Sequence, residues 1–220
     1  MSVPLLQAEG ISLGYANAQG WQAVLEDFDL QLQAGEVVSI LGPSGVGKSS
    51  LLRVLAGLQA AHRGRVSLHG EPLEGPHPRV AVAFQDPSLL PWLSLDKNVA
   101  FGLDFARQPH LSLAERKARI DHAITAVGLQ HARHHYPAQL SGGMAQRTAI
   151  ARCLARQPQV LLLDEPFGAL DEVTRTDMQQ LLLQVIAEHN TAAVLITHDI
   201  DEALLLSERI LLLGNSPART

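Results

Sequence analysis

The chain has 220 residues, of which 46% are hydrophobic, so it can bury one substantial core with a smaller lobe attached. Its formal net charge of −5 argues against a nucleic-acid binder, whose affinity would depend on clustered Lys and Arg. A single cysteine, Cys153, excludes an intrachain disulfide. Because Cys153 falls on an expected helix face, we predict a buried structural thiol.

We expect no targeting signal at the start of the chain. The N-terminal segment MSVPLLQAEG lacks the basic and apolar regions of a signal peptide. No run in the chain reaches the ~18 apolar residues that a membrane span requires. We therefore expect a cytoplasmic location.

The first part of the chain has the pattern of β structure. Residues 5–41 contain apolar segments of strand length separated by Gly, Asn and Gln, which predicts an antiparallel β layer. Apolar residues then recur at helical spacing from Lys48 to Leu58, which predicts a helix. The stretches AHRGR (61–65) and EGPHP (74–78) have the composition of ordinary turns.

The middle of the chain, residues 87–155, is expected to be mainly helical. Ser112 and Glu115 have the spacing of a capping box, and Gly128 can end the helix that they begin. Apolar runs at 160–163 and 192–197 lack alternation, as in strands covered on both faces of a parallel sheet. Between these runs, Met178, Leu181, Leu182, Val185 and Ile186 mark one side of a crossover helix.

A glycine-rich loop stands between an expected strand and an expected helix. The stretch GPSGVGKSS matches the pattern G-x-x-x-x-G-K-[ST], although an ordinary glycine turn is the alternative. Its glycines let backbone N–H groups face phosphate oxygens, Lys48 would neutralise phosphate charge, and Ser49 would hold Mg²⁺. The residues expected around the phosphates are Gly42, Pro43, Ser44, Gly45, Gly47, Lys48, Ser49 and Ser50.

Two carboxylates follow the apolar run VLLL at 160–163. If that strand belongs to a parallel sheet, Asp164 emerges beside the glycine loop, where it would support Mg²⁺. Glu165 could orient and deprotonate an attacking water. His198 follows the last buried strand, and could hydrogen-bond a γ-phosphate oxygen. Without the glycine loop, a solvated turn would be the better interpretation of these residues.

A second anion-binding pattern occurs about a hundred residues after the first. In LSGGMAQR, Ser141, Gly142 and Gly143 offer a hydroxyl and N–H groups at a helix start. They bring neither a lysine nor a metal ligand, so they would complete a phosphate site rather than make one. The histidines His131, His134 and His135 lack accompanying Cys or carboxylate ligands, and we expect a surface loop there.

These motifs, in this order and over nearly the whole chain, resemble the ATP-binding cassette of ABC transporters. The resemblance rests on GPSGVGKSS, FQDP with Gln85, LSGGMAQR, LLLDEPFGALD and LITHD. It implies an α/β fold with a P-loop NTPase core and mostly parallel sheet, an N-terminal antiparallel β layer and an inserted helical lobe. We expect residues 1–86 and 156–220 to form the core, and residues 87–155 the lobe.

The resemblance also implies roles for single residues. Tyr15 would stack on adenine, with a strand-end tyrosine as the alternative. Gln85 would sense Mg²⁺ and nucleotide, and Asp171 would cross a dimer seam. In this family two cassettes pair head to tail around ATP, so the phosphate that Ser141 contacts would belong to a second copy.

Finer likenesses point to one branch. LLPWLSLDKNVAFGL, DEPFGALDEVTR and THDIDEALLLSERILLL resemble the ATPase subunits of nitrate, sulfonate and taurine importers. Two residues differ from that branch: Ala145 stands where the branch often has a basic residue, and Asp86 stands where Glu is common. The likeness implies a transmembrane permease docking near Leu90 and Trp92, a solute-binding protein as an indirect partner, and a place on the cytoplasmic face of the inner membrane. The alternative for Trp92 is burial in the lobe's core.

Other ATPase classes fit less well. The ATPase of an exporter or lipoprotein-release complex stays open as the alternative. A DNA-repair ATPase of this superfamily would need a long coiled coil between the glycine loop and LSGG, and a GTPase would need an N-K-x-D motif. Because Thr220 follows soon after the last expected strand, we expect no C-terminal regulatory domain.

Overall fold

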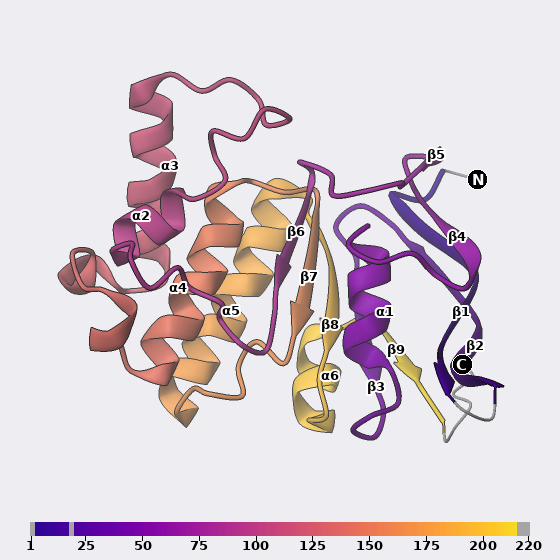
Figure 1. The fold of residues 1–220 in the computed structure, drawn as a ribbon. Helices are drawn as coiled ribbons and strands as arrows, with labels where there is room; N and C mark the ends of the chain where they lie inside the picture. The colour runs from indigo at the N-terminus through magenta and orange to yellow at the C-terminus, as the bar shows by residue number, and fades with distance from the viewer. Residues whose placement is uncertain (1–2, 18–19, 215–220) are drawn as a thin grey trace.

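The computed structural model describes residues 3–17 and 20–214, which form two β-sheets and six α-helices (Figure 1). The antiparallel sheet has the strand order β2-β1-β4-β5. Its strands are β1 (Leu6–Asn17), β2 (Gly20–Leu32), β4 (Arg63–Leu68) and β5 (Glu71–Pro72). The antiparallel layer expected from the sequence is therefore present, but the stretch 61–65, expected as a turn, contributes the start of β4.

The second sheet is parallel throughout its pairings and has the order β6-β7-β8-β3-β9. Its strands are β3 (Val37–Leu41), β6 (Val80–Ala83), β7 (Val160–Asp164), β8 (Ala192–Ile196) and β9 (Arg209–Leu212). The assignment of residues 37–41 to the antiparallel layer was wrong. Every residue of β3 is buried, because the strand lies inside this sheet and is covered on both faces.

The helices are α1 (Lys48–Leu55), α2 (Leu95–Ala100), α3 (Leu113–Ala126), α4 (Gly142–Ala155), α5 (Glu172–His189) and α6 (Ile200–Leu206). Short 3₁₀ helices occupy Gln130–Ala132 and Pro137–Gln139. The capping box of Ser112 and Glu115 begins α3 as predicted, and Gly128 follows its end with a φ of 68°. The expected helix from Lys48 is shorter than predicted: it ends at Leu55, and Leu58 beyond it is exposed.

Successive residues of the parallel strands enter two different hydrophobic cores. In β7, Val160 and Leu162 pack with α1 and the antiparallel sheet, whereas Leu161 and Leu163 pack with the helices on the opposite face. Figure 1 shows this arrangement, with α4 and α5 on one side of the parallel sheet and α1 with the antiparallel sheet on the other. Two-sided burial explains why these strands show no alternation in the sequence.

Helix α4 connects the helical region to the sheet. It packs against α2 and α3 and also against β6. Cys153 on α4 is buried as predicted, and its Sγ donates to the Val82 carbonyl oxygen at 3.3 Å. Burial raises the pKa of this thiol to about 11. The division into a core and a lobe at residues 87 and 155 stays a prediction.

Some expectations concern features outside these elements. His131, His134 and His135 are exposed, and the described residues contain no group of three His, Cys, Asp or Glu side chains that could hold a metal. No helix of the described chain is long and apolar enough to cross a membrane. The expectation about the chain end at Thr220 lies outside the described residues.

Candidate active site

The glycine loop connects β3 to α1, as the sequence predicts. Gly47 takes the cap position of α1 with a φ of 95°, and a Cβ there would lie 2.9 Å from Cγ1 of Val24. A side chain at residue 47 would therefore be strained by its backbone and would push against β2. The side chain of Lys48 is buried, and its Nζ donates to the carbonyl oxygens of Gly42 at 2.7 Å and Pro43 at 3.0 Å.

A hollow of about 430 Å³ lies above this loop. Its lining joins the glycine loop to residues that follow three strands of the parallel sheet. The lining residues are Ser44, Gly45, Gly47, Lys48, Ser49, Ser50, Gln85, Asp164, Glu165 and His198. The structure therefore brings together residues that are up to 154 positions apart, from Ser44 to His198.

Asp164 ends β7 and is buried. Burial raises the pKa of its carboxyl group, while a hydrogen bond from the Ser49 side chain and the charge of Lys48 act in the opposite direction. The Ser49 hydroxyl and the Asp164 carboxylate are hard oxygen ligands of the kind that Mg²⁺ prefers. A bound cation would also compensate the burial of Asp164, so these residues fit a magnesium site.

Glu165 lies between two polar side chains. Its Oε2 accepts from Nε2 of Gln85 at 3.0 Å, and its Oε1 lies 3.2 Å from Nδ1 of His198. Gln85, Glu165 and His198 follow β6, β7 and β8, which are neighbours in the sheet. The backbone at Glu165 has a φ of 46°, a left-handed conformation that is uncommon for glutamate. The β7–β8 pairing helps to hold this conformation, because the Glu165 N–H donates to the Ile196 carbonyl oxygen at 2.8 Å.

Tyr15 is not part of this hollow. It pairs with Gln22 across β1 and β2, and its side chain is 51% exposed. Val24, two residues beyond Gln22, contacts the position of Gly47, so the two strands do reach the glycine loop. Tyr15 is exposed, and its stacking on adenine stays a prediction.

The serine and glycines of the second anion-binding pattern also lie outside the hollow. Ser141 caps α4, and its Oγ accepts from the Met144 N–H at 3.2 Å. Ser141 and Gly142 are exposed at the start of the helix. Within a single chain these groups therefore have no part in the pocket formed by Lys48.

Asp171 stands close to this exposed helix start. A Cβ at Gly143 would lie 3.3 Å from Cδ2 of Leu170 and 3.4 Å from the Ala169 carbonyl oxygen. Asp171 caps α5 by accepting from the Thr174 N–H at 3.0 Å and its Oγ1 at 2.8 Å, which holds the pKa of Asp171 below its usual value. The starts of α4 and α5 therefore form one exposed surface that carries polar groups.

Trp92 is exposed rather than buried in the lobe. Its exposed fraction is 69%, whereas Leu90 and Leu93 are half-buried. Asn98, which the sequence analysis missed, explains this geometry. Its buried amide accepts from the Leu90 N–H at 2.8 Å and donates to the Leu90 and Leu93 carbonyl oxygens at 3.2 and 2.9 Å. In the sequence Asn98 follows Asp96 and Lys97, so it looks like one more polar residue of a short helix and no local pattern marks it.

Comparisons with known proteins show to which family the chain is similar. Residues 25–168 match a family model described as ABC transporter. The chain is 45% identical to the nitrate transport protein NasD of Klebsiella oxytoca over 99% of this chain and 83% of that protein. It is 46% identical to the aliphatic sulfonates import ATP-binding protein SsuB 1 of Xanthomonas axonopodis pv. citri (strain 306), over 96% of this chain and 84% of that protein.

A solved structure also resembles the whole chain. It is the dimeric structure of a post-hydrolysis state of the ATP-binding cassette MJ0796 bound to ADP and Pi, which is 31% identical in sequence. The two folds superpose with a TM-score of 0.87 over 98% of each chain.

Proposed function

The chain belongs to the ABC transporter family of ATPases, and we propose that it is the ATP-hydrolysing subunit of an importer for a small anion. The observation that carries this proposal is the position of Glu165 between Gln85 and His198, in the same hollow as Lys48 and Asp164. A carboxylate held there can accept a proton from a water that attacks the phosphate bound by the glycine loop.

Each residue of the hollow has a chemical part in this proposal. Lys48 releases its two carbonyl partners and binds phosphate oxygens, while the N–H groups of the glycine loop surround the phosphates. Ser49, Asp164 and Gln85 would hold Mg²⁺, which neutralises charge on the phosphates when bound. His198 would donate to a γ-phosphate oxygen, and Gln85 would keep the Glu165 carboxylate in place.

We propose that a second copy completes the site. Ser141, Gly142 and Gly143 do not line their own hollow, so the phosphate that they contact would belong to another molecule. Asp171 beside them would contact the same partner. Tyr15 would stack on the adenine of the nucleotide bound in its own chain. The dimeric structure of the related cassette supports the pairing of two copies.

The cargo class follows from the relatives. They are named for transport of nitrate and import of aliphatic sulfonates, which are small anions. Such cargo would pass through separate membrane subunits fed by a solute-binding protein, with this chain bound peripherally at the cytoplasmic face of the inner membrane. The competing function, an exporter or lipoprotein-release ATPase, has no comparable support among these relatives.

An uptake experiment tests the importer function. Cells that lack the gene for this chain are expected to lose uptake of nitrate or of an aliphatic sulfonate. The wild-type chain should restore uptake, and the Glu165→Gln variant should not, because it lacks the carboxylate that accepts the proton. Normal uptake of both anions in the deletion strain, with a defect in secretion instead, would favour the exporter function.

The exposed Trp92 supports a docking surface for the membrane subunit. Trp92→Ala should leave the melting temperature and the ATPase rate of the isolated subunit unchanged, since the side chain is 69% exposed. It should weaken assembly with the membrane subunit by ~2 kcal/mol or more, because aromatic anchors are common interface hot spots. Copurification and uptake measure this effect.

The matched control is Phe105→Ala. Phe105 is also an exposed aromatic side chain, and its ring packs on Phe101. This variant should assemble and transport normally. If Trp92→Ala transports as well as the wild type, Trp92 does not belong to the docking surface.

A further inference from the structure

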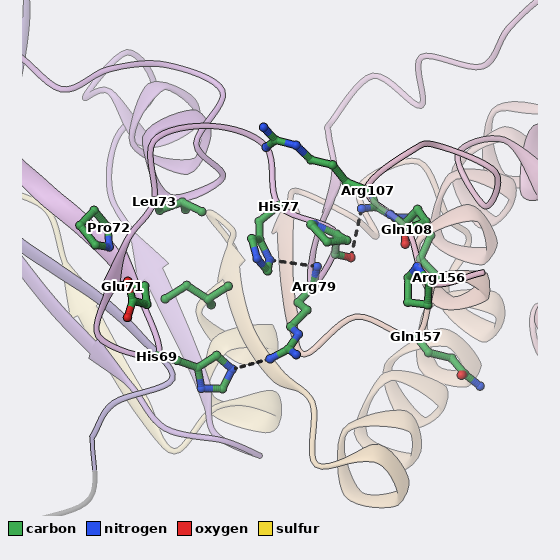
Figure 2. Close-up of a pocket in the computed structure, with 13 residues that line it drawn as sticks. His69, Glu71, Pro72, Leu73, His77, Arg79, Arg107, Gln108, Arg156 and Gln157 are labelled. Carbon is green, nitrogen blue, oxygen red and sulfur yellow. Dashed lines mark hydrogen bonds between the residues drawn. The ribbon is translucent and has the colours of Figure 1, made fainter. Parts of the chain in front are cut away.

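A second hollow, of about 660 Å³, lies near the opposite edge of the parallel sheet from the candidate active site. Four segments line it: the β4–β5 turn, the loop before β6, the segment before α3 and the two residues that follow α4 (Figure 2). Arg79 precedes β6, whereas Gln85 of the active site follows that strand. The two hollows are therefore separated by the length of β6.

Positive charge is concentrated in this second hollow. Arg79, Arg107, Arg156, His69 and His77 line it, and Glu71 is the one carboxylate among its lining residues. Within the part of the chain that the structure describes, none of the three guanidinium groups makes an ion pair. The arginines of this hollow thus differ from Arg133, Arg175 and Arg209, which contact carboxylates.

Neutral groups accept hydrogen bonds from these arginines and leave their charge uncompensated. Arg107 donates to the Pro76 carbonyl oxygen at 3.3 Å, and Arg156 donates to the Pro78 carbonyl oxygen at 3.2 Å. Figure 2 shows Arg79 directed toward His69, whose Nε2 lies 3.5 Å from the guanidinium. A cation that faces an imidazole in this way gains little electrostatic stabilisation.

The titration of His77 is consistent with this local excess of positive charge. Partial burial lowers the pKa of His77, and the charges of Arg79, His69 and Arg107 lower it further. Burial also lowers the pKa of the Arg156 guanidinium. A bound anion would stabilise the charged forms of both His77 and Arg156.

The hollow also has an apolar wall and more room than an inorganic ion needs. Leu68, Leu73 and Pro109 contribute to the wall. A volume of this size falls within the range of small-molecule sites, which are lined by apolar side chains with a few polar groups that fix orientation. Guanidinium groups are well suited to bind the oxygens of anionic head groups through paired hydrogen bonds.

We propose that this hollow binds a small organic anion whose sulfonate or phosphate head group contacts Arg79 and Arg107, with its carbon chain against the apolar wall. Arg79 directly precedes strand β6 of the parallel sheet, and Arg107 belongs to the segment that leads to α3. A ligand that bridges them ties the helical region to the antiparallel and parallel sheets. The site is separate from the nucleotide hollow and does not depend on the proposed transport function.

Titration of the full chain tests this site. Mg-ADP at saturation first fills the glycine loop, and ¹H–¹⁵N spectra then follow addition of 1-butanesulfonate, butyl phosphate, inorganic sulfate or 1-butanol. The two organic anions should shift the amide signals of His69, His77, Arg79 and Arg107. Sulfate and butanol should each bind at least about tenfold more weakly, because each lacks one of the two contacts.

Variants distinguish this site from the nucleotide site. The double variant Arg79→Gln/Arg107→Gln should lose at least about tenfold in affinity for both organic anions while retaining its melting temperature and ATPase rate. Arg63→Gln, at an exposed arginine on β4 outside the hollow, is the control for loss of a surface arginine and should bind normally. Lys48→Ala should also bind both organic anions normally, even without nucleotide.

Three results would overturn the proposal. The first is that the organic anions shift only signals of the glycine loop. The second is that the double variant binds them as tightly as the wild type does. The third is that sulfate or butanol binds as tightly as butanesulfonate. Loss of ATP binding in Lys48→Ala would not affect the test of anion binding. The proposed nucleotide site and the proposed anion site can therefore fail independently of each other.

Discussion

Replacing Glu165 with Gln should reduce ATP turnover by about 10²- to 10⁴-fold while ATP binding persists, because the amide keeps the shape of the side chain but cannot accept a proton. The contact with Nε2 of Gln85 at 3.0 Å positions this carboxylate, and an amide oxygen can accept the same hydrogen bond. Because bound ATP then stays intact, the variant should accumulate as a closed dimer. Light scattering after size-exclusion chromatography with Mg-ATP measures the molecular mass of the variant and distinguishes a monomer from a dimer.

Asp201→Asn is the matched control for this variant. Asp201 lies in the first turn of α6 and is an exposed carboxylate outside the hollow. It should hydrolyse ATP at the wild-type rate and remain in the wild-type association state. If Glu165→Gln hydrolyses ATP normally, or stays monomeric with Mg-ATP, the role assigned to Glu165 is wrong.

Replacing Ser141 with Arg should lower the ATPase rate by about 100-fold or more, as loss of a donor that acts on the reacting phosphate commonly does. ATP binding by the single chain should remain, since Ser141 does not line its own nucleotide hollow. The arginine would obstruct the phosphate that a second copy presents. Steady-state ATPase rates and the binding of a fluorescent nucleotide separate the two effects.

Ser112→Arg provides a control with the same chemistry. Ser112 caps α3 as Ser141 caps α4, with its Oγ 3.2 Å from the Glu115 N–H. Losing this cap should cost about 1 kcal/mol of stability but leave ATP turnover intact. Equal losses of activity in both variants would mean that Ser141 acts only as a helix cap.

The sequence predicted which residues gather around the glycine loop better than it predicted the sheet that supports them. The glycine loop, Asp164 and Glu165 are encoded by short patterns, because the backbone must curl around phosphates and strands must end at a common edge. Which strands share a sheet depends on contacts between distant segments. Residues 37–41 were therefore placed in the wrong sheet, although their continuous apolar character was the signal for burial on both faces.

Two other features depend on long-range contacts. The exposure of Trp92 follows from Asn98, whose amide fixes the backbone of Leu90 and Leu93. The basic hollow joins His69, Arg79, Arg107 and Arg156 from four segments, and in the sequence each looks like an ordinary surface residue. No local pattern marks either feature, since only the packed chain brings the groups together.

The central claim is that each nucleotide site is built from the glycine loop of one copy and the LSGG segment of another, and mixing two inactive variants tests it most directly. In a heterodimer of Lys48→Ala and Ser141→Arg, one site carries both defects and the other carries neither. An equal mixture should recover up to about a quarter of the wild-type ATPase rate, because half of the randomly formed dimers hold one intact site. A mixture that stays as inactive as its two parents would contradict the claim.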